Sequence, residues 1–410
     1  MEEKNQEDMA PRVRGAWRTC LPVRRKEESG MKKFAALLLA LMMALCAVSA
    51  LADVAADVEA GQALSHDELL EKARAESGTF VVYGNTSRIA TAAEEFAALY
   101  GIPTEANNLK DQEIYTKLRN ENGNEAADMV MIQDGAQLTD AIDEGLVINF
   151  VPASVKAALD EADQQPALVH QYINKLFIYN NLGDDVPAIK NVWELTAPEM
   201  KDRVIFKNPE SEKVNMNFLV MCTKDEWAEK LAAAYKAWKG EEIDLTGYQN
   251  AGYKWVAEFL DNCTFGKSDT SIAEEVSQET AAGKIGLFVL SKLRSFSVLT
   301  DNLTVAQYDA SARGYAIEPF AGFMYPMYTM VNTKATRPYT GMLFIEYLMS
   351  QDGFKPWGKS IGAYSPDPAI AVNEGDLAID VWKSTLVMED AAYILDSFEV
   401  EDFILLHCQQ

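Results

Sequence analysis

The chain has 410 residues, of which 48% are hydrophobic and 24% are charged, and its formal net charge is −25 at pH 7. These proportions are typical of a globular protein, and the length allows two domains with cores of their own. The excess of acidic residues excludes a general affinity for nucleic acid or anionic lipid, because both carry charge of the same sign.

The stretch 31–52 has the three parts of a secretory signal peptide. A methionine and two lysines begin it, an apolar run follows, and Ala-Leu-Ala closes it. We therefore expect export to the periplasm or the cell surface, with cleavage before Asp53. An uncleaved membrane anchor is the alternative. Residues 1–30 are polar and of mixed charge, which indicates a start codon assigned too far upstream.

The cysteines predict neither a disulfide framework nor a zinc site. Cys46 would carry a lipid only within a lipobox, and Leu45 stands where such a motif has a small residue. Three cysteines remain after position 52, an odd number with no closely spaced pair. A single disulfide is the alternative, with its pairing left open among Cys222, Cys263 and Cys408.

A buried strand that runs through a polar loop into a helix is predicted for Gly78–Gly101. Phe80–Tyr83 has strand composition, and apolar residues recur at helical spacing from Ile89 until Gly101. The loop between them, Gly84–Arg88, leaves backbone N–H groups and the positive end of a helix dipole at the end of the strand. The pattern predicts a ligand cradle. An ordinary capped helix after a strand is the alternative.

The same arrangement recurs where Asp128–Ile132, another buried strand, ends in Gln133-Asp134-Gly135 and runs into a helix. Weaker patterns complete this half of the chain. They predict a helix over 65–75, a strand opened by Ile102, a helix over 111–120, a strand over 146–150, a helix that Pro152 starts, and a strand over 176–179.

A loop after Asn180 marks a crossing into a second domain, where strand, polar loop and helix alternate again. Such alternation predicts an α/β fold of two lobes, each a mostly parallel sheet flanked by helices. The predicted strands are 203–206, 263–265, 284–289 and the aromatic stretch 322–332. The predicted helices are 224–239, 248–262 and 339–349. Breaks in the chain follow at 352–368, and the terminal helices surround Trp382 and Tyr393.

No catalytic constellation stands out, so we expect a protein without enzymatic activity and without a cofactor. Gly358–Gly362 matches GxSxG, but a nucleophile elbow needs a buried strand before it and a helix after it, and neither is predicted. The histidines, His66, His170 and His407, are isolated from one another. The sequence contains no Walker A loop and no GxGxxG motif.

Four segments resemble the solute-binding proteins of bacterial ABC importers, in their ferric-iron-type branch. VVYGNTSR at 81–88 looks like the opening of that family's first lobe, and DMVMIQDGAQL at 128–138 looks like its second-strand signature. VNTKATRPYTGMLFIEYLMSQDG at 331–353 is similar to the segment that returns to the first lobe, and GAYSPDP at 362–368 to the end of the binding region.

The resemblance implies a type II periplasmic-binding-protein fold with a hinge between its lobes. Residues 53–178 and 320–365 would form lobe 1, and 179–319 and 366–410 would form lobe 2. Such a protein is a monomer that holds a small solute between the lobes and delivers it to an ABC permease in the membrane. Carried over by position, the ligand would contact Thr86, Ser87, Arg88, Gln133 and Asp134 in lobe 1 and Asn215, Ser268, Asp269, Ser291 and Arg294 in lobe 2.

The sequence departs from the ferric carriers at the place of their iron-binding tyrosine pair, just after the strand that ends at Val289. Leu290, Ser291 and Lys292 stand there instead. Tyr325 and Tyr328 lie in the next strand, where packing in the core is favoured over iron ligation. Both are carried as candidate ligand residues, and the metal, if any, stays open.

Basic residues near the predicted helix starts suit an anionic or metal-complexed solute. They are Arg88, Lys207, Lys292 and Arg294, although Lys207 and Lys292 fit solvated surface charges better. Asp134 and Asp269 would instead suit a polyamine, and ferric iron is a further alternative ligand. An extracellular hydrolase and a ligand-sensing module on the same scaffold are the alternative functions.

Overall fold

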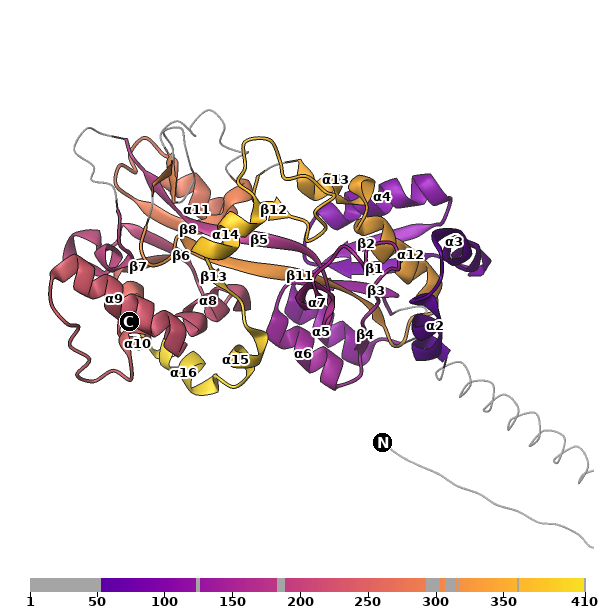
Figure 1. Ribbon diagram of the computed structural model, residues 1–410, viewed down its shortest axis with the longest axis horizontal. Coiled ribbons are helices and arrows are strands. Elements are labelled where there is room, and N and C mark those ends of the chain that lie inside the picture. The colour runs from indigo at the N-terminus through magenta and orange to yellow at the C-terminus, as the bar shows by residue number, and fades with distance from the viewer. Residues whose placement is uncertain are drawn as a thin grey trace, which may run out of the picture. The chain divides into compact units, whose positions relative to one another are not determined.

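The computed structural model describes residues 53–122, 126–182, 189–292, 303–306, 314–315, 317–359 and 361–408, which belong to one compact unit (Figure 1). The predicted signal peptide, Cys46, Arg294 and Ser360 lie outside these residues. Within the described ranges, no helix combines the length and the apolar character needed to cross a membrane.

Eight strands follow one another across a single sheet, in the order β2-β1-β3-β11-β5-β8-β6-β7. β1 pairs in parallel with β2 and β3, and β6 pairs in parallel with β7 and β8. These two parallel groups are the sheets of the first and second lobes. The strands are β1 (Phe80–Gly84), β2 (Thr104–Asn108), β3 (Met129–Ile132), β5 (Leu168–Asn180), β6 (Val204–Lys207), β7 (Cys263–Gly266), β8 (Ile285–Val289) and β11 (Gly322–Asn332).

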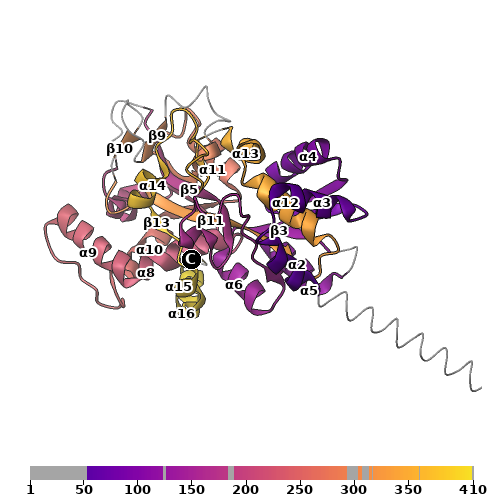
Figure 2. The same cartoon turned by 45° about the vertical axis from the view of Figure 1, so that its right-hand side comes forward.

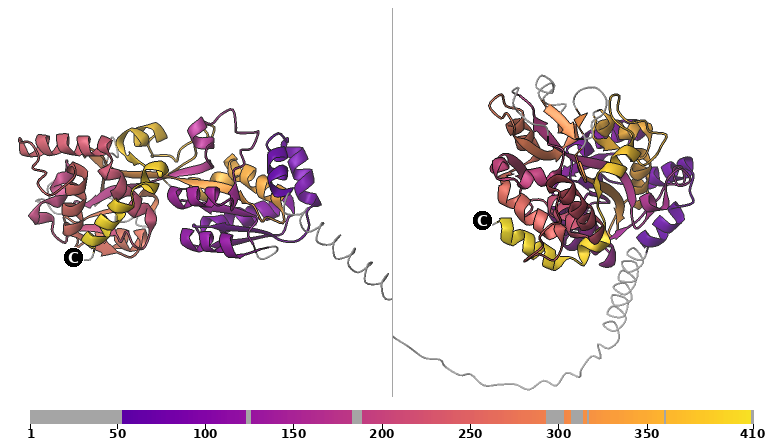
Figure 3. Two further views of the ribbon diagram at one scale, coloured as in Figure 1. Left: turned by 90° about the horizontal axis from the view of Figure 1, so that it is seen from below. Right: turned by 60° about the vertical axis from the view of Figure 1, so that its left-hand side comes forward.

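The long strands β5 and β11 join the two lobes. They pair with each other in antiparallel fashion over Leu168–Leu176 and Gly322–Thr329. Beyond that stretch, β11 continues along β3 and β5 continues along β8, again antiparallel. Figure 3 shows both strands running between the two groups of elements. The predicted α/β architecture with a mostly parallel sheet in each lobe is therefore confirmed, and the lobe boundaries stay a prediction, because β5 and β11 belong to both lobes.

Helices cover both lobes, and local capping fixes the start of one and the end of another. Ser65 accepts a hydrogen bond from the Glu68 backbone N–H in a capping box, and Gly101 (φ 73°) ends α4. In the first lobe α3 and α12 lie side by side (Figure 2). The first-lobe helices are α2 (Asp53–Gly61), α3 (His66–Ala75), α4 (Arg88–Tyr100), α5 (Asp111–Asn120), α6 (Gly135–Asp143), α12 (Pro338–Leu348) and α13 (Gln351–Gly358), and those of the second lobe are α8 (Lys213–Thr223), α9 (Asp225–Lys239), α10 (Ala251–Asn262) and α11 (Asp269–Val276).

Each lobe has an aromatic centre. Phe96 and Phe344 meet edge to face in the first lobe, with their ring centroids 5.0 Å apart, and Trp255 stacks on Phe259 at 4.6 Å in the second. All four side chains are buried. Such pairs add about 0.5–1.5 kcal/mol each to the free energy gained by burying their surface.

The C-terminal segment contacts both lobes. β13 (Val387–Met388) pairs with β11, α15 (Ala391–Leu395) packs on α6 and α8, and α16 (Phe398–Cys408) packs on α8 and α10. The remaining short elements are β4 (Val147–Ile148), α7 (Glu161–Gln164), η2 (Val192–Thr196), η3 (Pro198–Met200), β9 (Leu303–Ala306), β10 (Gly314–Tyr315), β12 (Ala363–Tyr364) and α14 (Ile379–Thr385).

Two sequence-based expectations were wrong, and a third gave a strand that was too short. Pro152 does not start a regular helix, because the chain there forms only turns such as Val155 N–H to the Pro152 carbonyl. The predicted break after 352 contains α13, although Pro356 stands inside this helix and has no N–H to donate to the Asp352 carbonyl four residues earlier. The strand over 176–179 is the end of the much longer β5.

Candidate functional site

A cavity of about 220 Å³ lies between the two lobes. Its lining combines the loop after β1, the ends of β3 and β8, the middle of β5 and β11, and the segment around α13 and β12. It is lined by Asn85, Thr86, Ser87, Arg88, Gln133, Gln171, Ile173, Glu212, Asp269, Val289, Ser291, Lys292, Tyr325, Met327, Trp357, Gly362 and Ala363.

The first-lobe wall is the start of α4. Ser87 precedes the helix in a helical conformation, and its side chain makes no capping hydrogen bond. The first turn is held by the Ile89 N–H, which donates to the Thr86 carbonyl at 3.1 Å. The positive end of the α4 dipole therefore lies at the cavity beside Arg88.

Asp111 holds one side chain and one backbone N–H of the same wall. Its Oδ1 accepts a hydrogen bond from Asn85 Nδ2 at 2.8 Å and a longer one from the Gln133 backbone N–H at 3.4 Å. Burial, with the charges of Asp134 and Glu212, raises the pKa of Asp111 well above its usual range. The polar groups of this wall are thus fixed from behind by a carboxyl group that does not line the cavity.

A network of four buried charges forms the second-lobe wall. Lys175, in β5 and 1% exposed, places Nζ 2.8 Å from Glu212 Oε2 and 3.4 Å from Asp269 Oδ1. Lys207 Nζ lies 2.6 Å from Glu212 Oε1 and 3.3 Å from Asp269 Oδ2. Two ammonium groups therefore alternate with two carboxylates, and the charges of this network cancel.

The pKa values follow from this alternation. Burial opposes the ionisation of Glu212, but Lys175 and Lys207 outweigh it and hold the pKa of Glu212 at about 2. Burial likewise opposes the charge of Lys175, and Asp269 with Glu212 nevertheless raises the pKa of Lys175 above its usual value. The expectation that Lys207 is a solvated surface charge was wrong, since only 12% of its side chain is exposed.

Tyr325 lies on the floor of the cavity, in the middle of β11. It is 3% exposed and stacks on Phe323, with the ring centroids 5.7 Å apart. Burial raises the pKa of Tyr325 and that of Tyr328 well above the usual range, and nearby carboxyl groups add to the effect. Tyr328 is also buried, but it does not line the cavity. A phenolate at either position would need a metal to offset this shift.

Of the predicted site residues, Thr86, Ser87, Arg88, Gln133, Asp269, Ser291 and Tyr325 line the cavity. Arg294 lies outside the described residues, and three of the others have structural contacts. Asp134 caps α6, Ser268 caps α11, and Asn215 accepts a hydrogen bond from Lys175 Nζ at 2.9 Å. Among the described residues, no group of three or more histidine, cysteine, aspartate or glutamate side chains could hold a metal ion.

Sequence reasoning missed several lining residues. Asn85 lies in the predicted loop, directly before Thr86, and Glu212 directly precedes α8, so both stand at the kind of helix start from which the other wall residues were predicted. Gln171 lies in a part of β5 too polar to read as a strand. Trp357 lies in α13, which the glycine and proline residues of that stretch concealed.

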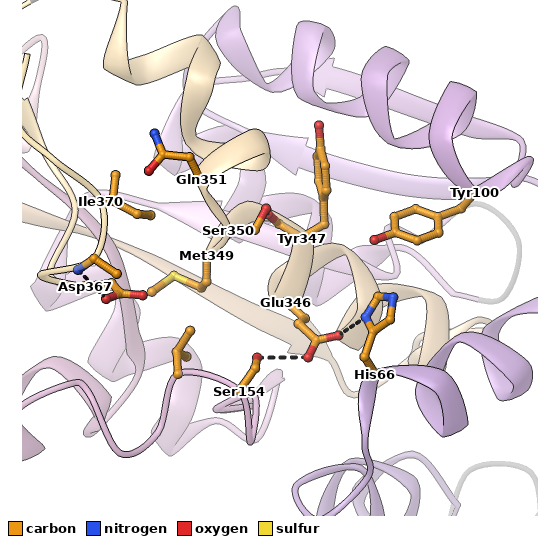
Figure 4. Close-up of a pocket in the computed structure, with 12 residues that line it drawn as sticks. His66, Tyr100, Ser154, Glu346, Tyr347, Met349, Ser350, Gln351, Asp367 and Ile370 are labelled. Atoms are coloured by element: carbon orange, nitrogen blue, oxygen red, sulfur yellow. Dashed lines mark hydrogen bonds and ion pairs between the residues drawn. The ribbon is translucent and has the colours of Figure 1, made fainter.

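A second cavity, of about 340 Å³, lies in the first lobe (Figure 4). Glu346, in α12, accepts hydrogen bonds from His66 Nδ1 at 2.8 Å and Ser154 Oγ at 2.9 Å. The serine and the histidine both contact the carboxylate and not each other, so this is not the serine–histidine–acid order of a hydrolase. The GxSxG segment has the wrong setting too, since α13 precedes it and β12 follows it.

No protein-family model and no curated protein matches the sequence. Solved structures match the fold. Iron-bound HitA from Pseudomonas aeruginosa has 13% identity and a TM-score of 0.59, with 81% of this chain and 99% of that chain covered. AfuA from Actinobacillus pleuropneumoniae, a periplasmic binding protein with fructose-6-phosphate bound, has 14% identity and a TM-score of 0.58, covering 81% and 97%.

A third similar structure is IdiA (FutA) from Trichodesmium in complex with iron and citrate. Its sequence identity is 12% and its TM-score is 0.55, and the match covers 81% of this chain and 100% of that chain. Sequence identities this low support a shared fold and nothing beyond it. The order of strands and the likeness to these proteins together show that the chain has the two-lobed α/β fold of type II periplasmic binding proteins.

Proposed function

We propose that this protein is an extracytoplasmic solute receptor without catalytic activity, which captures a small anionic or metal-complexed solute between its lobes and delivers it to an ABC permease. One observation carries the proposal. A single cavity takes its walls from both lobes, with Thr86 on one side, Ser291 on the other and Tyr325 between them. A solute that contacts both walls stabilises the closed arrangement of the lobes over any open one.

The electrostatics of the cavity favour an anionic group. Both carboxylates of its lining, Glu212 and Asp269, are bound by Lys175 and Lys207, so they do not need a cationic ligand. The opposite wall presents the amino end of α4 and Arg88. The positive end of a helix dipole and a guanidinium group both favour carboxylates and phosphates.

The volume favours a small solute. At about 30 Å³ per water molecule, a cavity of about 220 Å³ corresponds to roughly seven waters. A sugar phosphate, a short carboxylate or a phosphonate is of this order of size, whereas a peptide is not. The amide side chains of Asn85, Gln133 and Gln171 supply donors and acceptors for the hydroxyl groups of such a solute.

A thermal-shift screen with sugar phosphates, carboxylates, phosphonates, ferric complexes and polyamines tests the proposal. A ligand at a hundred times its Kd stabilises a protein by about 2.7 kcal/mol, which is several degrees. We expect an anionic solute to give such a shift without being consumed, and Arg88→Met to remove it. Arg74→Met, on the exposed face of α3, is the matched control. Turnover of the stabilising compound would contradict the proposal.

Two further arms test the ligand class and the export. A thermal shift caused by ferric ion that disappears in the Tyr325→Phe, Tyr328→Phe double variant would show that the ligand is iron and not an anion. Stabilisation by polyamines alone would show that the ligand is a cation. Expression with the native leader should give an extracytoplasmic protein whose first residue is Asp53, measured by intact mass. Loss of solute uptake on removal of the receptor gene would separate an importer from a sensor.

A further inference from the structure

Three side chains meet where the two lobes touch beside the C-terminal segment. Asp134, at the start of α6, comes from the first lobe, and Asn217, in α8, comes from the second. Asn217 Nδ2 donates to Asp134 Oδ1 at 3.3 Å and to Glu389 Oε2 at 3.2 Å. Glu389, between β13 and α15, also accepts a hydrogen bond from the Gly135 N–H at 3.1 Å. One amide group thus bridges two carboxyl groups across the lobes.

This contact is rich in acceptors and poor in donors. Asp134 and Asn217 are each 1% exposed, and Asp134 Oδ2 and Asn217 Oδ1 have no hydrogen-bond partner within the described ranges. Glu389 is partly buried as a residue, but its carboxyl group is enclosed. Buried acceptors without donors are costly, and two buried carboxylates that face each other are more so. A hydrogen-bond donor supplied to these acceptors is the simplest way to lower this cost.

No lysine or arginine described here supplies that donor. Lys213, whose charge acts on Asp134, pairs with Glu401 at 2.6 Å, and Lys224 pairs with Asp390 at 2.7 Å. The absence of a side chain at Gly135 leaves room for this contact, because a Cβ there would lie 2.4 Å from Glu389 Oε1 and the glutamate side chain would have to shift.

We propose that Asp134 and Glu389 share one proton, and that this acid pair and Asn217 form a latch between the lobes which loosens as the pH rises. A proton held by either carboxyl group turns one acceptor of this contact into a donor and removes one of the two buried negative charges. The latch requires the two-lobed fold but no particular solute. Its test is therefore independent of the ligand proposed above.

The balance of the groups around Glu389 favours retention of the proton. Burial raises the pKa of Glu389 to about 8, with Asp134 and Asp111 adding to the rise against the hydrogen bonds from Asn217 and Gly135. The pKa of Asp134 is raised as well, by burial, although Asn217, the start of α6 and Lys213 lower it in part. From β11, Tyr325 and Tyr328 are kept neutral first by burial, which raises the pKa of each, and the charge of Glu389 adds to this rise.

The sign of the pH dependence follows. An acid whose folded-state pKa lies above its ordinary value of 4.5 holds its proton in the latched state after the open or unfolded state has lost it. The latch is therefore strongest at low pH, weakens as the pH rises above about 4.5, and has lost this contribution above about pH 8. Glu389→Gln mimics the protonated acid and should remove the dependence.

Infrared difference spectroscopy and thermal unfolding test the latch in the full-length mature protein. At pH 7 the wild-type minus Glu389→Gln spectrum should contain the C=O band of a protonated carboxylic acid. The melting temperature of the wild type should fall by several degrees between about pH 6 and about pH 9, relative to that of Glu389→Gln. Asp134→Asn removes the neighbouring charge and should move this fall to lower pH. Glu399→Gln, an exposed glutamate of α16, should retain the wild-type profile.

Three results would overturn the latch. The first is the absence of the protonated-acid band at pH 7. The second is a Glu389→Gln protein as unstable at pH 6 as Glu389→Ala, which would show that the charged form is needed. The third is a metal or ammonium ion that native mass spectrometry finds bound to the wild type and absent from Glu389→Gln. A cation, and not a shared proton, would then offset the charge of the two carboxyl groups.

Discussion

Replacing Lys175 by methionine should destabilise the protein more than any change of a surface lysine. The substitution keeps the length of the side chain but leaves Glu212 and Asp269 with Lys207 as their remaining partner, and it removes the donor that Asn215 accepts from. Breaking a buried ion pair from one side costs about 3–5 kcal/mol. Because Lys207 remains, we expect about 3 kcal/mol.

The pKa of Glu212 gives a second route to this magnitude. Its fall from 4.5 to about 2 corresponds to about 3 kcal/mol of stabilisation, at about 1.4 kcal/mol per pKa unit, shared by Lys175 and Lys207. A lowered carboxyl pKa contributes stability that is present above about pH 4.5 and is lost as the pH falls towards 2. The Lys175→Met variant should therefore lose less stability than the wild type on acidification.

Equilibrium unfolding in urea at pH 7 measures the loss, as a lower midpoint at an unchanged m-value. Lys355→Met, which removes an exposed pair with Asp352, is the control and should leave the midpoint unchanged within error. A loss below about 1 kcal/mol for Lys175→Met, or an acid-induced loss equal to that of the wild type, would refute the reasoning about the network.

Two further predictions concern the second lobe. Gly252→Ala should lower the free energy of unfolding by about 1–3 kcal/mol in the same urea assay, because a Cβ there would collide with the Cys222 carbonyl oxygen, which cannot move aside. Gly358→Ala is the control and should lower it much less, since its Cβ would meet only Phe354 at 3.5 Å. Burial raises the pKa of the Cys222 thiol well above its usual range, so a thiol reagent should label it only on unfolding, whereas fast labelling of the native protein would contradict its burial.

The sequence predicted local units well where one period dominates. The strand and helix of 80–100 and the helix of 111–120 were found because their apolar residues recur at fixed spacing. The first half of β5 escaped detection for a physical reason. His170, Gln171, Asn174 and Lys175 are all buried there, and their polarity hides the strand pattern. Their partners come from distant segments, which spacing along the chain does not reveal.

The same limit applies to the site. Loops after β1 and β8 were predicted to meet, and Thr86 and Ser291 do line one cavity, because strand ends of both lobes converge there. Asp134 was predicted from its place after β3, which cannot show that Glu389, more than 250 positions later, reaches the same helix start. Contacts between lobes depend on the tertiary arrangement, and a single sequence holds no periodic signal for them.

The pairing of β5 with β11 has a mechanical consequence. Eight residue pairs join the two strands into one ribbon, interrupted by a register shift between Met327 and Tyr328. A rotation of one lobe against the other has to be absorbed by bending and twisting this ribbon, since its pairing resists sliding. Ile173 and Tyr325 sit on the ribbon and would stay in place while the walls swing. In the proposed receptor, a solute would therefore meet a stationary platform first, and the moving walls would add their contacts afterwards.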